Sequence, residues 1–190
     1  MKNPSTRELF TYWNDRRGDR LAPERADIEP GAIRRVLSDS FILAFDRAAD
    51  HPFRLAGTKV CAFFGRELKD EPFVELWDQQ DRPQIRDLLR IVAEEASGLV
   101  AGAVATAADG KTADLELLLL PLLHQEQTQM RLLGALSAIN VPFWLGRHPV
   151  TSLTLGALRH LDPERKASRA ARLTQGSRLF GLTVYKGGRS

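Results

Sequence analysis

Two charged residues stand in apolar segments that have the pattern of β-strands. Arg54 lies within 53–57 and Glu116 within 112–120. A charged side chain on an inward face needs a partner, because an isolated buried charge is very costly. The two residues therefore pair with each other, line a pocket where they fix a polar ligand, or face solvent.

Arg66 and Cys61 are the next candidates for binding chemistry. Arg66 follows Gly65 at the end of a short predicted helix over 58–64. Its guanidinium suits carboxylates and phosphates, so anion recognition is one interpretation, and a salt bridge that ties the loop to a helix is the other. Cys61 is the single cysteine of the chain, and we interpret it as a small buried core thiol.

The sequence carries none of the motifs that we associate with catalysis. It has no glycine-rich phosphate loop, no cluster with metal-ligand spacing and no serine or cysteine in a nucleophile elbow. We therefore expect a protein that is not an enzyme and that holds no metal. Its output must then pass through a partner or through self-association.

The elements that position these residues follow one order along the chain. A helix over 5–16, capped by Ser5 or Thr6, comes first, and strands follow over 40–45 and 53–57. Short helices over 58–64 and 73–77 precede a longer helix over 81–96, with Asp81 as its cap. Strands over 99–107, 112–120 and 130–139 come next, and 153–158 is a further candidate strand. This order predicts an α+β domain with an antiparallel sheet.

Two of the predicted strands have unusual compositions. Residues 117–120 are all leucine, so this strand is apolar on both faces, and the outer face must be covered by the N-terminal helix or by a second subunit. Leu9, Tyr12 and Trp13, on one face of that helix, are therefore candidates for a dimer or partner interface. The strand over 99–107 is poor in large side chains, which either permits close packing or leaves a cavity.

Several short motifs resemble one family. They are Tyr12-Trp13 with Arg16 to Gly18, Pro23 to Pro30, Phe53 to Thr58 with Cys61, Phe64 to Leu68, Leu76-Trp77 before Asp81-Arg82, Glu116 to Pro121, Arg131 to Gly134 and Trp144 to Gly146. In their order and number they resemble the PAS-like family common in alphaproteobacteria, the PAS_5 group, over roughly residues 8 to 160.

The resemblance implies a five-stranded antiparallel sheet with helices on one face, plus an N-terminal helix and a C-terminal extension. We expect an N-terminal helix and extended linker over 1–30, the PAS-like domain over 31–160 and a basic extension over 161–190. The sheet would cup a pocket, for which the candidate ligand-binding residues are Arg54, Cys61, Phe64, Arg66, Trp77, Ala103 and Glu116. The family implies sensing or protein–protein regulation, and it specifies no ligand.

Two cofactors known from PAS domains are disfavoured. In flavin-binding light sensors the reactive cysteine directly follows a Gly-Arg-Asn motif. Here Gly65-Arg66-Glu67 is followed by Leu68, and the amide side chains that hold a flavin are missing. A haem sensor usually has an axial histidine on the longer helix. Residues 81–96 contain no histidine, so the identity of any cofactor stays open.

Composition indicates an ordinary globular protein in a reducing compartment. No apolar run approaches the roughly 20 residues of a membrane-spanning helix, and the N-terminus has no signal-like apolar core, so we expect a cytoplasmic location. The formal net charge is +3, and no acidic residue follows Glu164. That basic segment is either a solvated extension or a surface that contacts nucleic acid.

Taken together, these observations predict a stand-alone sensory or regulatory module that acts through ligand-modulated protein–protein interaction. Its expected partners are a signalling protein, a second copy of the chain, or both, and a small molecule is the candidate modulator. A ligand-free adaptor is the first alternative. A nucleic-acid-binding regulator that uses the basic C-terminal segment is the second.

Overall fold

The computed structural model describes residues 1–124 and 129–161. Within these ranges the chain forms three α-helices, four 3₁₀ turns and six strands. The helices and turns are α1 (Pro4–Arg17), η1 (Arg25–Asp27), η2 (Pro30–Ile33), η3 (Leu37–Asp39), α2 (Thr58–Phe64), η4 (Phe73–Leu76) and α3 (Arg82–Glu94). The strands are β1 (Ser40–Ala44), β2 (Phe53–Ala56), β3 (Gly98–Ala107), β4 (Thr112–His124), β5 (Gln129–Ala138) and β6 (Val150–Leu161).

The strands form a single antiparallel sheet in the order β2-β1-β5-β4-β3-β6. The predicted α+β class is therefore confirmed, but the predicted number of five strands is wrong. The sixth strand is the candidate over 153–158, which extends to 150–161 and pairs with β3 along most of its length. β6 thus covers the edge that β3 would otherwise expose.

Two helix caps differ from the prediction. α1 begins one residue earlier than expected, and its cap is Asn3, whose Oδ1 accepts the amide of Ser5 at 2.8 Å. Asp81 precedes α3, but its carboxylate accepts the amide of Leu155 in β6 at 2.7 Å instead of capping the helix. At α1 the residue before the predicted cap caps the helix, and at α3 the predicted cap binds a distant strand instead.

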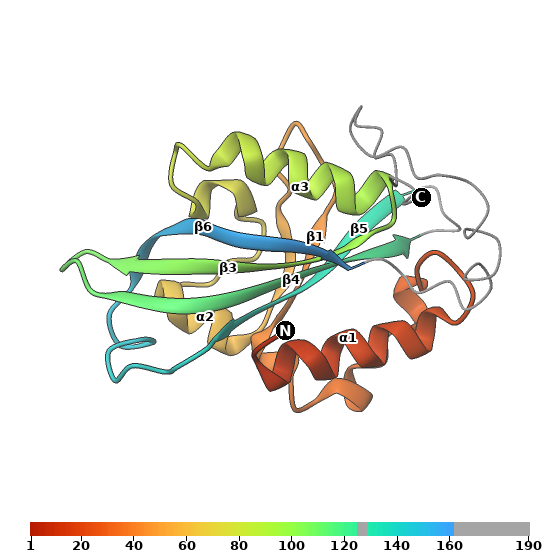
Figure 1. Cartoon of the computed structure of the whole chain (residues 1–190), viewed down its shortest axis with the longest axis horizontal. Coiled ribbons are helices and arrows are strands. Elements are labelled where there is room, and N and C mark those ends of the chain that lie inside the picture. Colours follow the sequence, from red (N-terminus) through yellow and green to blue (C-terminus); the bar gives the residue numbers. More distant parts are fainter. Residues whose placement is uncertain (125–128, 162–190) are drawn as a thin grey trace, which may run out of the picture.

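Helices cover both faces of the sheet, with α3 on one side and α1 on the other (Figure 1). We call the side of α2, α3 and η4 the inner face and the side of α1 the outer face. β4 contributes to both cores. Leu115, Leu117 and Leu119 belong to the inner core, while Leu118, Leu120 and Leu122 belong to the outer core.

The inner core is packed with aromatic side chains. Phe41 lies 5.5 Å, between ring centroids, from both Phe53 and Phe73, and Phe73 lies 5.9 Å from Trp77. The ring of Phe41 occupies the space beside Gly134 in β5, where an added Cβ would overlap it. This glycine is therefore required by a close approach, not by its backbone angles.

The outer core is closed by α1, which three hydrogen bonds fix at two points along β4. The carboxylate of Glu116 accepts the amides of Lys2 at 2.6 Å and Asn3 at 3.0 Å. Further along, the indole nitrogen of Trp13 donates to the carbonyl of Pro121 at 2.8 Å. The ladder between β3 and β4 ends at the pair of Leu99 with Leu119, so a proline at 121 removes no donor that β3 needs.

Burial acts to raise the pKa of Glu116, but the hydrogen bonds from the Lys2 and Asn3 amides and the nearby terminal amine outweigh it and hold this pKa below its usual value. Glu116 is only 5% exposed, and because its pKa is lowered it is ionised at neutral pH in spite of this burial. A charge beside the leucines of β4 thus specifies where α1 begins.

Gly134→Ala tests the close approach of Phe41. The new methyl group would force the ring out of its place, and we expect a loss of about 1–3 kcal/mol in the free energy of unfolding. Gly102→Ala is the matched control, because its Cβ would lie 3.8 Å from the carbonyl oxygen of Ala157 and meet nothing closer. Urea denaturation checks both variants, and equal losses in the two would contradict the packing described.

Glu116→Gln tests the anchor of α1. Glutamine cannot accept both amides as an ion does, so we expect a loss of about 1–2 kcal/mol at pH 7. The folded pKa lies below the reference value of 4.5, so the ionic contribution is present above that pH and is lost as pH falls through the folded pKa. The gap between variant and native protein should therefore narrow below about pH 4.5.

Asp114→Asn is the control for this measurement, because Asp114 lies on the same strand two residues away and is exposed. It removes the same net charge without touching α1. The anchor would be ruled out if the difference in unfolding free energy between Glu116→Gln and the native protein stayed constant from pH 7 to pH 3. It would also be ruled out if Asp114→Asn lost as much stability as Glu116→Gln.

Candidate functional site

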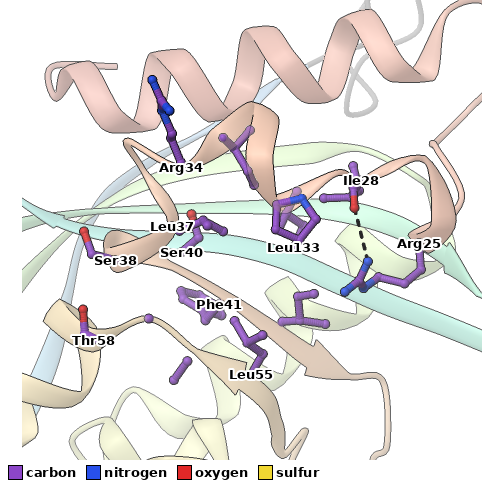
Figure 2. A pocket seen from close by; sticks show the side chains of 15 residues that line it. Arg25, Ile28, Arg34, Leu37, Ser38, Ser40, Phe41, Leu55, Thr58 and Leu133 are labelled. Atoms are coloured by element: carbon purple, nitrogen blue, oxygen red, sulfur yellow. Dashed lines mark hydrogen bonds between the residues drawn. The ribbon is translucent and has the colours of Figure 1, made fainter.

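A cleft of about 470 Å³ opens on the outer face, beside the edge of the sheet formed by β1 and β2 (Figure 2). We call it the outer cleft. Its apolar lining comes from the N-terminal turns and from three strands: Ile28, Pro30, Ile33, Leu37, Phe41, Ile42, Leu55, Ala56 and Leu133. Its polar lining residues are Arg25, Arg34, Ser38, Ser40 and Thr58. The size and the mainly apolar lining are those of small-molecule sites.

The two arginines of the outer cleft are oriented differently. Arg25 extends along the cleft, and its Nη1 donates to the carbonyl of Ile28 at 3.3 Å (Figure 2). Arg34 points away from the floor and is exposed (Figure 2). Leu55, at the mouth, is 44% exposed, which is high for a leucine beside a buried sheet. The cleft therefore offers uncovered apolar surface with one guanidinium directed along it.

Arg25 does not stand alone at its end of the cleft. Arg131 lies on β5 two residues before Leu133 and so faces the same side of the sheet. Burial lowers the pKa of Arg131, and the nearby charges of Arg25 and Arg54 lower it further. Arg25 of η1 and Arg54 of β2 are therefore near enough to Arg131 to act on it as positive charges.

One wall of the cleft is tied to α1 through Tyr12. Its hydroxyl donates to the carbonyl of Asp27 at 3.2 Å and accepts the amide of Glu29 at 2.8 Å. These two residues flank Ile28 and precede Pro30, both of which line the cleft. The cleft wall and α1 are therefore joined by two direct hydrogen bonds.

The structure does not bring the seven predicted ligand-binding residues together. Phe64, Trp77 and Ala103 are buried in the inner core. Glu116 lies on the opposite face, where the N-terminus of α1 occupies its carboxylate. Arg54 and Glu116 do not pair, because Nη1 of Arg54 binds Oδ1 of Asp70 at 3.2 Å.

The two candidates around α2 lie near the surface. Arg66 pairs with Glu71 at 3.2 Å, and because both residues belong to the loop after α2, this salt bridge does not tie the loop to a helix as one interpretation expected. Cys61 is partly buried, with its Sγ 3.5 Å from Oε1 of Glu67. Burial raises the pKa of the Cys61 thiol, and the Glu67 carboxylate adds to the shift, so the thiol is in its neutral form at pH 7.

Ala103 and Glu116 both border a second hollow, of about 500 Å³, near the N-terminus.

In the described ranges, no three His, Cys, Asp or Glu side chains are grouped as metal ligands would be. None of the described helices combines the length and apolar character that crossing a bilayer requires. The basic segment after Leu161 lies outside the described residues.

The predicted interface residues are placed on the molecule's own sheet. Leu9 is 0% exposed and Trp13 is 2% exposed, both within the outer core. Of the two covers that the doubly apolar strand allowed, the structure shows the N-terminal helix. An interface role for Leu9, Tyr12 and Trp13 stays a prediction, and for Leu9 and Trp13 it requires α1 to leave the sheet.

Sequence analysis missed the outer cleft because its walls come from segments far apart in the chain. Leu55 carried a signal: it occupies an outward position in a short strand whose neighbours Arg54 and Ala56 gave no reason for a large apolar side chain there. One exposed leucine is ordinary on a protein surface, so this residue gains its meaning only from the apolar cleft that it borders.

The sequence matches the family PAS_5, described as a PAS domain, over residues 1–137. No curated protein matches it significantly. Similar solved structures include one from a study of a flavin analogue in a light-oxygen-voltage domain, with 16% identity and a TM-score of 0.46, covering 62% of this chain and 87% of the other. Another is the PAS domain of an HTR-like protein from Haloarcula marismortui, with 19% identity and a TM-score of 0.40, covering 57% and 90%.

The family match takes in α1, the outer cleft and the strands from β1 nearly to the end of β5, whereas β6 lies beyond it. The match extends over well more than half of the chain. This chain therefore belongs to the PAS_5 family of PAS domains.

Proposed function

We propose that this PAS domain is a sensory module that regulates a partner protein by binding a ligand. An occupant of the outer cleft changes how α1 lies on the sheet, and α1 in turn controls association with a partner protein or a second copy of the chain. The observation that carries this proposal is the pair of hydrogen bonds that Tyr12 makes to Asp27 and Glu29, which couple the cleft wall to α1.

An occupant of the cleft would contact both the N-terminal turns and the sheet. Ile28 and Ile33 belong to the segment between α1 and the sheet, whereas Ile42 and Leu133 belong to the sheet itself. A ligand between them favours one spacing of wall and floor. It shifts the equilibrium only as far as its affinities for the two arrangements differ.

Displacement of α1 would create a large interaction surface. The helix covers Leu118, Leu120 and Leu122, and its own Leu9 and Trp13 would be uncovered with them. A contiguous apolar patch of this kind is typical of a protein–protein contact. This gives the predicted interface role of Leu9, Tyr12 and Trp13 a mechanism, in which the interface forms when α1 moves.

A ligand-free adaptor is the second candidate, and the filled inner core favours it. Phe41, Phe53, Phe73 and Trp77 occupy the space that a cupped sheet would otherwise offer to a cofactor. In an adaptor the outer cleft would receive a side chain from the partner.

Two further expectations remain parts of the proposal. They are a cytoplasmic location and the division of the chain into an N-terminal helix with linker over 1–30, a PAS-like domain over 31–160 and a C-terminal extension over 161–190.

Leu55→Trp and Tyr12→Phe test the coupling between cleft and α1. The indole of Leu55→Trp would lie over the cleft mouth and imitate an occupant. We expect it to change amide hydrogen exchange in α1 by about fivefold or more, which corresponds to a coupling of about 1 kcal/mol. In the double variant with Tyr12→Phe the change should be lost from α1 and kept in residues 25–33.

Val141→Trp is the control, because Val141 is 76% exposed and does not line the outer cleft. It adds the same indole to the surface and should leave exchange in α1 unchanged. If Leu55→Trp altered residues 25–33 while α1 kept its native exchange rates, the proposed function would be wrong.

A further inference from the structure

We infer that the occupant of the outer cleft is a small amphipathic anion, an alkyl or acyl chain that ends in a carboxylate or phosphate. This inference rests on the proposed function and adds the chemical class of the ligand. The assignment comes from two features of the same cleft. Its lining is apolar along most of its length, and its charged residues are all positive.

The apolar part of the cleft fits a chain without polar groups. Ile42 and Leu133 line the floor of the cleft, and their side chains are only 6% and 2% exposed. Leu55 is left 44% exposed at the mouth, so a chain lying beneath it would cover surface that the protein itself leaves open. Each methylene that is fully buried there would tighten binding by about fourfold.

The charged end of the cleft selects the head group. None of the 15 lining residues is acidic, and Arg25 extends along the cleft (Figure 2). In the ranges 1–124 and 129–161, the neighbouring carboxylates of Asp27 and Asp70 pair with Arg20 and Arg54, and no ion pair reaches Arg25. Its guanidinium therefore has donors left for an anion, for which its planar fork is suited.

Arg131 strengthens this end of the site. It lies on β5 two residues before Leu133, a lining residue, and so shares its face of the sheet, although Arg131 does not itself line the cleft. Arg25 and Arg54 act on Arg131 as neighbouring positive charges. An anion among these arginines would relieve their mutual repulsion, whereas an ammonium group would add to it.

Four eight-carbon probes separate the chain from the head group: octanoate, octyl phosphate, octanol and octylammonium. Binding is followed in the full chain by the methyl resonances of Ile28, Ile42 and Leu55, below the micelle-forming concentration of each probe. We expect at least one anionic probe to bind about fivefold more tightly than octanol, and octylammonium to bind most weakly.

Arg25→Gln should remove this preference, and Arg25→Lys should keep most of it, since lysine retains the charge. Arg47→Gln is the matched control, because Arg47 is an exposed arginine that pairs with Glu94 and does not line the cleft. Octanoate and octyl phosphate compared with each other show which head group the site prefers. Loss of the preference in Arg25→Gln but not in Arg47→Gln would support the inference.

Two results would overturn the ligand class. If all four probes shifted the three methyl groups with equal affinity, the cleft would bind chains without regard to charge, and the proposed function would stand without the anion. If none shifted them, this ligand class would be wrong. The exchange experiment on Leu55→Trp needs no ligand, so it judges the proposed function separately in either case.

Discussion

A strand that is apolar on both faces must be covered on both faces, and β4 imposes this requirement on the whole domain. Its leucines pack alternately into the inner core and the outer core, so the chain must supply a covering layer for each face. The inner layer comes from the segments between β2 and β3. The outer layer comes from the first 39 residues, as one helix and three short turns. The outer cleft lies where this thinner cover meets the edge of the sheet at β1 and β2.

Polar contacts specify where the outer layer lies along β4. Glu116 holds the start of α1, and the carbonyl of Pro121 holds Trp13 further along. Five residues of a strand span about 17 Å, and the ten residues of helix from Asn3 to Trp13 rise about 15 Å. The two spacings agree, so α1 is held at two points along the same strand. Tyr12 then joins the helix to the wall of the cleft.

Local signals predicted most of the elements, and long-range contacts decided the site. The apolar periodicity of 81–96 predicted α3, and Asp109-Gly110 predicted the turn between β3 and β4, because each signal acts within a few residues. The partners of Glu116 lie 113 and 114 residues away, and that of Asp81 lies 74 residues away, so no local pattern could assign them. The outer cleft draws its lining from three separate segments of the chain, within 25–42, over 55–58 and at Leu133, and it became visible only in the folded structure.

For the proposed regulation, α1 with the adjoining turns must move as a layer of its own while the inner face stays in place. Native-state hydrogen exchange at low denaturant concentration measures this. We expect amides of α1 and residues 25–39 to open together at a lower free energy than those of β4, β5 and α3. If α1 exchanged only with global unfolding, at the same free energy as the central strands, the helix could not serve as the moving part and the proposed regulation would be contradicted.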